Sequence, residues 1–89
     1  MLLNLLKEKK EEDEEAREEQ LYHRALEVVF DEGKASTSLL QRKVGIGYGM
    51  SVRFIDRLEA EGIITPYCKG ESYRKLLMTR QAYESKEKN

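Results

Sequence analysis

The sequence predicts a mainly α-helical domain with a small β-hairpin, arranged as a winged helix-turn-helix and preceded by a charged N-terminal arm. Three observations predict this fold class. Apolar residues recur at helical spacing in three segments between residues 21 and 61. Glycines separate these segments, and the turn between the second and third is short. A β-favouring run then leads through a polar, glycine-containing loop into a second such run.

Length and composition limit the chain to one small domain with a modest core. The single cysteine excludes an internal disulfide and a cysteine-rich zinc site, and it favours a reducing, cytoplasmic compartment. The leucine cluster in Met1–Leu6 is too short for a membrane span or a signal peptide, so no membrane contact is expected. No motif calls for a cofactor or a metal, and none is expected.

Charge is distributed unevenly along the chain, although the net charge is only -1. Residues 1–33 carry 11 acids and 5 bases, whereas residues 34–80 carry 4 acids and 9 bases. Charge alone fits two interpretations equally well: an unevenly charged surface without a role, or an acidic arm joined to a basic domain. A basic domain is what a phosphate backbone attracts.

The chain divides into three predicted parts. Residues 1–20 form a charged arm, which is either a solvated helix or disordered, because it is rich in helix formers but has no apolar stripe. The leucines of Met1–Leu6 offer a contact for a partner chain and hence a homodimer. Residues 21–80 form the winged-helix domain, and residues 81–89 form a polar tail without a predicted structure.

Two helices open the predicted domain. The first has an apolar face from Leu21 to Phe30, and Gly33 caps its end. The second begins after an N-cap at Ser36, or alternatively at Ser38, which has a glutamine three residues later as in a capping box. It is short because two glycines follow it.

The third predicted helix spans residues 48–61 and ends at Gly62. Val52, Ile55 and Leu58 recur every three residues and are expected to point inward. The opposite face carries Gly49, Met50, Arg53 and Arg57.

A β-hairpin, the wing, follows this helix. Ile63–Thr65 favours a strand that Pro66 closes, and Cys68–Ser72 is a polar loop around a glycine. Tyr73–Met78 is the predicted return strand.

The stretch from Ala35 to Pro66 resembles the gamma domain of the FtsK/SpoIIIE family of DNA translocases. Arg74 also falls where that family has an arginine in the wing strand, and the resemblance covers about residues 21–78. The matching residues are Ala35, Ser36, Ser38, Gln41, Arg42, Ile46, Gly47, Tyr48, Arg53, Ile55, Asp56, Glu59, Gly62 and Ile63.

The resemblance implies a winged-helix module that reads short sequence signs on double-stranded DNA and so orients an attached motor. It also implies contact with a translocase or a site-specific recombinase as partner. Gamma domains are not enzymes, and this sequence has no phosphate-binding glycine loop followed by lysine and serine or threonine, so it contains no motor.

Three positions depart from the family pattern. The family has an arginine where this chain has Gly45, and an Asn-Arg pair where it has Gly49 and Met50. The resemblance places that pair at the start of the recognition helix, reaching the bases, so its loss removes side chains suited to bidentate contacts. The acidic arm also lies outside the pattern and, with Met1 at its start, suggests a stand-alone protein.

The predicted DNA contacts follow from this placement. The helix over residues 48–61 enters the major groove, where Arg53 reaches a base edge and Arg57 a phosphate. Met50 is placed to touch a thymine methyl. Tyr48 either donates to a phosphate or packs beside Ile46, and packing is slightly favoured. Backbone contacts are expected from Ser36, Arg42 and Lys43 in the second helix. The wing residues Lys69, Arg74 and Lys75 are expected to contact the backbone or the minor groove.

Three alternatives remain open from the sequence. A stand-alone transcriptional regulator would read two half-sites as a dimer. A protein-interaction module would have kept the scaffold and lost base reading, with an acidic arm that repels DNA or covers the basic face. An enzyme has no support, because no nucleophile, base and orienting group are grouped together.

Overall fold

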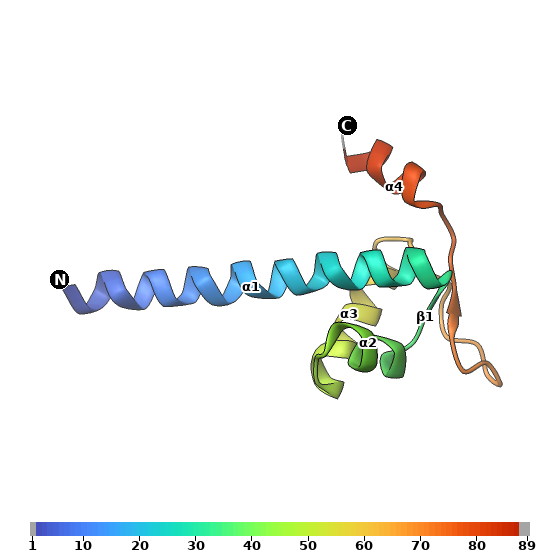
Figure 1. Ribbon diagram of the computed structural model, residues 1–89, viewed down its shortest axis with the longest axis horizontal. Helices are drawn as coiled ribbons and strands as arrows, with labels where there is room; N and C mark the ends of the chain where they lie inside the picture. Colours follow the sequence, from blue (N-terminus) through green and yellow to red (C-terminus); the bar gives the residue numbers. More distant parts are fainter. Residues whose placement is uncertain (1, 88–89) are drawn as a thin grey trace.

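The computed structural model describes the backbone of residues 2–87 and the side chains of residues 14–87. Four helices and a small antiparallel sheet confirm the predicted fold class (Figure 1). In chain order the elements are α1 (Leu2–Glu32), β1 (Lys34–Ala35), α2 (Thr37–Val44), α3 (Tyr48–Ala60), β2 (Arg74–Lys75) and α4 (Arg80–Glu87).

Helix α1 joins the charged arm to the domain without interruption. It runs from Leu2 to Glu32, through position 21 where the first helix of the domain was expected to begin. No glycine or proline interrupts the chain before Gly33. The helix ends there, because Gly33 adopts the left-handed conformation with φ of 74° and donates its N–H to the Val29 carbonyl at 2.9 Å. The N-terminal part of α1 extends well beyond α2 and α3 (Figure 1). The predicted partner contact of Met1–Leu6 lies outside the described side chains.

The core is built on one stripe of α1. Tyr22, Ala25, Leu26 and Val29 are buried, and α2 and α3 pack against this stretch of the helix. The Tyr22 ring meets the Phe54 ring edge-on, with centroids 5.3 Å apart. Burial of each large apolar side chain stabilises the fold by about 1.5–3 kcal/mol. The stripe therefore fixes how the helix-turn-helix sits on α1.

Helix α2 begins and ends as the sequence predicts. The Ser36 hydroxyl accepts the N–H of Leu39 at 3.1 Å, so the first of the two predicted caps is the one used. Gly45 ends the helix in the left-handed conformation, with φ of 82°.

Helix α3 also ends at its predicted glycine. Gly62 has φ of 76° and donates to the Glu59 carbonyl at 3.0 Å, while Ile63 donates to the Leu58 carbonyl at 2.9 Å. This paired arrangement is a Schellman motif, which satisfies carbonyls at the helix end.

The inward face of α3 differs at one position from the prediction. Val52 is only half-buried, whereas its neighbour Ser51 is fully buried. The Ser51 hydroxyl donates to the Gly47 carbonyl at 2.9 Å, which makes its burial tolerable. Ile55 and Leu58 are buried as expected.

The wing pairs differently from the predicted two-stranded hairpin. Its first strand is a single bridge between Ile64 and Leu76, rather than a run over Ile63–Thr65. Strand β2 pairs instead with β1, in the register Lys34 with Lys75 and Ala35 with Arg74. The sequence prediction missed β1 because a two-residue strand between two helices carries no periodic signal.

Helix α4 was also missed, since residues 81–89 were expected to be a tail. Thr79 caps it by accepting the N–H of Ala82 at 3.1 Å. The ring centroids of Tyr83 and Phe30 lie 5.8 Å apart, and Arg80 forms an ion pair with Asp31 of α1. Figure 1 shows α4 on the side of α1 opposite to α2 and α3.

Two kinds of feature are absent from the described residues. Within residues 2–87, no helix is long and apolar enough to cross a membrane. Among the described side chains, His, Cys, Asp and Glu form no group of three or more that could hold a metal ion.

Loss of the α2 cap should destabilise the domain. We expect Ser36→Ala to lower the free energy of unfolding by about 1 kcal/mol, because it leaves the Leu39 N–H without its partner. Ser38→Ala is the matched control, since the exposed Ser38 hydroxyl contacts only Ser36 Oγ among the described atoms. Urea unfolding monitored by circular dichroism measures both; a larger loss in Ser38→Ala would place the cap at Ser38 instead.

Candidate nucleic-acid interface

The outer face of α3 is partly exposed and partly packed. Tyr48 at its first position is 66% exposed, so its side chain lies outside the core. Packing beside Ile46, which the sequence slightly favours, stays a prediction. Gly49 faces open space, where a Cβ would meet no atom within 4 Å. Met50 is half-buried and packs against the core, so it is less available for a base contact than its predicted position implied.

Arg53 projects from the middle of this face, and its side chain is 63% exposed. Its Nη2 donates to Oε1 of Glu18, a residue of α1, at 2.8 Å. This is an ion pair between α3 and the acidic arm. The two residues lie 35 positions apart in the sequence, and only the packing of α3 on α1 brings them together.

Arg57, one turn further along α3, is held more firmly. Its guanidinium donates to Glu19 at 2.6 and 3.3 Å and to Glu61 at 2.9 Å. It also lies 3.8 Å from the ring centroid of Tyr22, a cation–π contact. With its side chain 40% exposed, Arg57 is an anchor between α1 and α3 as well as a candidate phosphate contact.

These contacts shift the proton affinities of the groups involved. The hydrogen bond from Arg57 lowers the pKa of Glu19 from its ordinary value of 4.5. The hydrogen bond to Glu19 correspondingly raises the pKa of Arg57, so the pair is fully charged at neutral pH. Burial raises the pKa of Tyr22, whose hydroxyl is buried without a hydrogen-bond partner among the described residues.

A hollow between α2, α3 and the wing brings three predicted contact residues together. Ser36 from the start of α2, Tyr48 from the start of α3 and Arg74 from β2 all line it. The Arg74 guanidinium donates to Glu59 at 2.7 Å and to the Thr65 carbonyl at 3.0 Å, which fixes its position. The remaining lining residues are Ala35, Thr37, Ile55, Tyr67, Glu71, Ser72 and Tyr73.

The other predicted lysines and Arg42 are exposed on α2 and the wing. Lys43 Nζ lies 3.9 Å from Glu32, and Lys75 Nζ lies 3.7 Å from Glu71. Both are loose surface ion pairs, which contribute little to stability. Lys69 lies in the turn of the wing loop that precedes β2. All four side chains can therefore turn toward an approaching phosphate.

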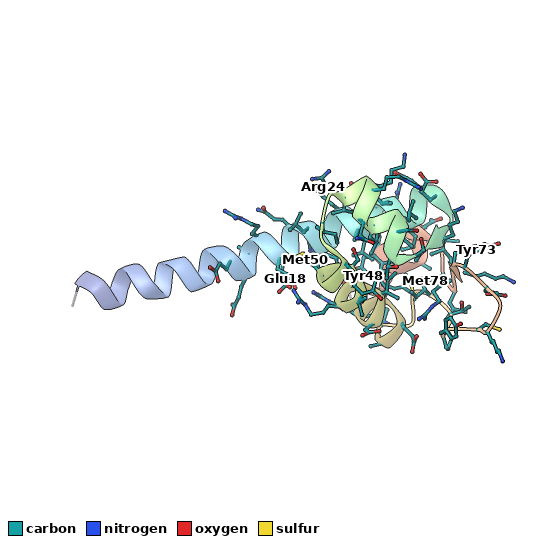
Figure 2. All side chains as sticks on the ribbon, turned by 90° about the horizontal axis from the view of Figure 1, so that it is seen from below. Glu18, Arg24, Tyr48, Met50, Tyr73 and Met78 are labelled. Atoms are coloured by element: carbon teal, nitrogen blue, oxygen red, sulfur yellow. The ribbon has the colours of Figure 1, made fainter. Side chains whose placement is uncertain are left out.

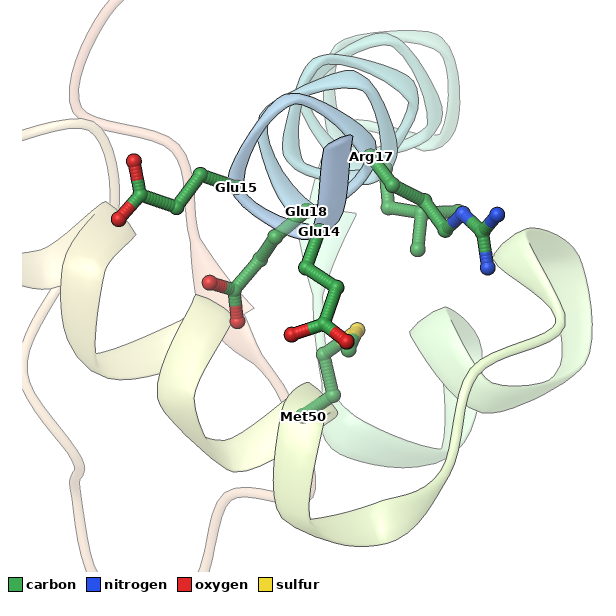
Figure 3. Close-up of a pocket in the computed structure, with 6 residues that line it drawn as sticks. Glu14, Glu15, Arg17, Glu18 and Met50 are labelled. Carbon is green, nitrogen blue, oxygen red and sulfur yellow. The ribbon is translucent and has the colours of Figure 1, made fainter. Parts of the chain in front are cut away.

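The arm contributes residues to this face that sequence reasoning did not single out. Glu14 of α1 points toward Met50 at the start of α3, as Figure 3 shows, whereas Glu18 points to one side of Met50 and pairs with Arg53. With Glu15, Arg17 and the apolar Leu21 they line a groove between the two helices. The net charge of the arm indicated that it could cover the basic face, but only the fold shows which carboxylates reach α3.

Comparison with known proteins identifies the family. The family model "Ftsk gamma domain" matches residues 16–79, more than half of the chain. The chain belongs to the FtsK gamma domain family. The match begins within α1 and ends with the wing, so it takes in both helices of the helix-turn-helix and leaves out residues 2–15 of the arm and α4.

Individual relatives agree with the family model. A DNA translocase FtsK from Caldanaerobacter subterraneus subsp. tengcongensis is 45% identical over 69 residues, 78% of this chain and 9% of that protein. DNA translocase SftA from Bacillus subtilis is 46% identical over 62 residues, 70% of this chain and 6% of that protein. DNA translocase SpoIIIE from the same organism is 36% identical over 66 residues, 74% of this chain and 8% of that protein. The chain thus spans less than a tenth of the length of these relatives.

The Glu19–Arg57 contact should be lost in acid. Because the pKa of Glu19 is lowered in the folded state, its charge stabilises the fold at pH values above 4.5. This contribution disappears as the pH falls through the lowered pKa. We expect Glu19→Gln to lower the thermal midpoint at pH 7 by a few degrees, corresponding to roughly 0.5 kcal/mol for an exposed pair.

Thermal unfolding followed by circular dichroism from pH 7 to pH 3 measures this difference. The two proteins should converge at the acid end of the series. A difference that stays constant over the whole series would show that Glu19 acts through packing and not through its charge.

Proposed function

We propose that this chain binds double-stranded DNA, with α3 in the major groove and with α2 and the wing on the sugar-phosphate backbone. The observation that carries the proposal is membership of the FtsK gamma domain family, whose relatives are named DNA translocases. As part of such a system, the module would orient or load a motor rather than catalyse a reaction itself.

The geometry supports this docking mode. Arg53 is the exposed arginine of α3 with a single carboxylate partner among the described residues, so it has the reach and the freedom for a base edge. Arg74 and Tyr48 flank the same hollow between α3 and the wing, where a backbone would pass. Exposed Arg42, Lys43, Lys69 and Lys75 add positive charge for phosphate contacts.

A protein-interaction module is the second candidate. It is favoured by Gly49 and Met50 at the start of α3, where the resemblance expects an Asn-Arg pair, and by the acidic arm lying beside them. A recombinase or translocase would be the partner in that case. A stand-alone regulator that dimerises through Met1–Leu6 is a third arrangement, and it needs the same DNA-binding face.

Removing Arg53 should weaken duplex binding. We expect Arg53→Ala to lose about tenfold in affinity, because a base contact of arginine contributes about 1–3 kcal/mol. Arg24→Ala is the matched control, because it removes the same charge from an exposed position on α1. Figure 2 shows Arg24 at a distance from the group formed by Glu18, Met50 and Tyr48.

Fluorescence anisotropy with a random duplex library at two salt concentrations measures both variants. Binding should weaken steeply as salt rises, because phosphate contacts release counterions. Absence of duplex binding at low salt would contradict the DNA-binding proposal and favour the protein-interaction module. Equal losses in Arg53→Ala and Arg24→Ala would show that charge matters but α3 does not read the groove.

Restoring the family pair should sharpen sequence reading. We expect Gly49→Asn with Met50→Arg to raise the preference for selected over random duplexes by about tenfold, since each bidentate base contact discriminates by about 1–3 kcal/mol. The open space at Gly49 accepts the new side chain. The double variant Gly49→Ala with Met50→Ala is the control, and sequencing of the retained duplexes measures the preference. If the preference for selected duplexes is unchanged, this turn of α3 does not read bases.

A further inference from the structure

We infer that the acidic arm is an intramolecular competitor for the DNA-binding face, with Glu18 occupying the guanidinium of Arg53 until DNA displaces it. This inference rests on the proposed function, because it concerns the regulation of the same face. Glu18 accepts from Arg53 at 2.8 Å, and the next residue, Glu19, accepts from Arg57 at 2.6 Å. Both arginines of α3 that were predicted to touch DNA are thus paired with consecutive carboxylates of α1.

The chemistry of the pairing is that of a phosphate contact. A carboxylate and a phosphate both present anionic oxygens to the planar donors of a guanidinium. DNA must therefore replace the Glu18 carboxylate at Arg53 before that side chain can reach the groove. Residues 11–19 carry seven acids and one base, so the arm also repels an approaching phosphate backbone.

The two ion pairs have different roles. Arg53 is 63% exposed and has one carboxylate partner among the described residues, so its pair is readily exchanged. Arg57 is held by Glu19, Glu61 and the face of Tyr22, so its pair keeps α1 docked on α3. Competition consequently takes place at Arg53, while the arm remains attached to the domain through Arg57.

The position of the arm reinforces the competition. Glu14 points toward Met50, at the end of α3 that the proposed docking brings nearest to the bases (Figure 3). Glu18 pairs with Arg53, one turn further along α3. Leu21 lines the same groove with Met50. The arm therefore places negative charge beside the part of α3 that would read sequence.

The test compares two removals of one negative charge from the arm. Glu18→Gln breaks the charged pair with Arg53, whereas Glu15→Gln removes the same charge from an exposed residue that forms no ion pair with α3 among the described side chains. We expect Glu18→Gln to tighten binding of the full chain to a random duplex at low salt by about twofold to fivefold, the size of one exposed ion pair. The gain from Glu15→Gln should be clearly smaller.

A coupled variant locates the competition at Arg53. In an Arg53→Ala background, Glu18→Gln should give no more gain than Glu15→Gln, because the competing pair is already gone. Glu18→Ala repeats the test with a side chain that cannot accept a hydrogen bond, since the glutamine amide can still do so. Thermal unfolding of each variant confirms that the domain is folded.

The outcomes separate this inference from the proposal beneath it. Equal gains from Glu18→Gln and Glu15→Gln, or a gain that survives in the Arg53→Ala background, would overturn competition at Arg53 and leave DNA binding standing. Failure of every variant to bind duplex at low salt would overturn the proposed function and the competition together.

Discussion

The packing of one apolar stripe of α1 against the helix-turn-helix is the constraint on which the rest of the structure depends. Tyr22, Ala25 and Val29 are buried there, and Phe54 of α3 closes on the Tyr22 ring. Because α1 is one continuous helix, docking of this stripe also determines where the preceding turn lies. Glu18 and Glu19 belong to that turn, so their approach to α3 follows from the core and needs no separate folding event.

Much of the fold could be predicted from local signals. Ser36, Gly33, Gly45 and Gly62 each act at the helix end expected of them, since caps and left-handed turns depend on the residue itself. Helix α4 could not be predicted in this way. Its residues have no apolar stripe, and it is ordered by the Thr79 cap and by contacts with α1.

The candidate site shows the same division. Its arginines on α3 were identified from their place on the helix and from family resemblance. The carboxylate partners of these arginines could not be identified from the sequence. The Arg53–Glu18 pair joins residues 35 positions apart, and nothing in a run of acids distinguishes Glu18 from Glu15. Likewise, Met50 was assigned to an outer face by periodicity alone, although the neighbouring α1 partly covers it.

The continuity of α1 has a mechanical consequence. Residues 2–32 form a rod of about 45 Å, since a helix rises about 1.5 Å per residue. The C-terminal end of this helix packs in the core, so the helix axis is expected to move with the domain as one rigid body. The direction of the N-terminal part of α1 is therefore set by the packing of α3 on the core, whereas a flexible tether of the same length would have no fixed direction.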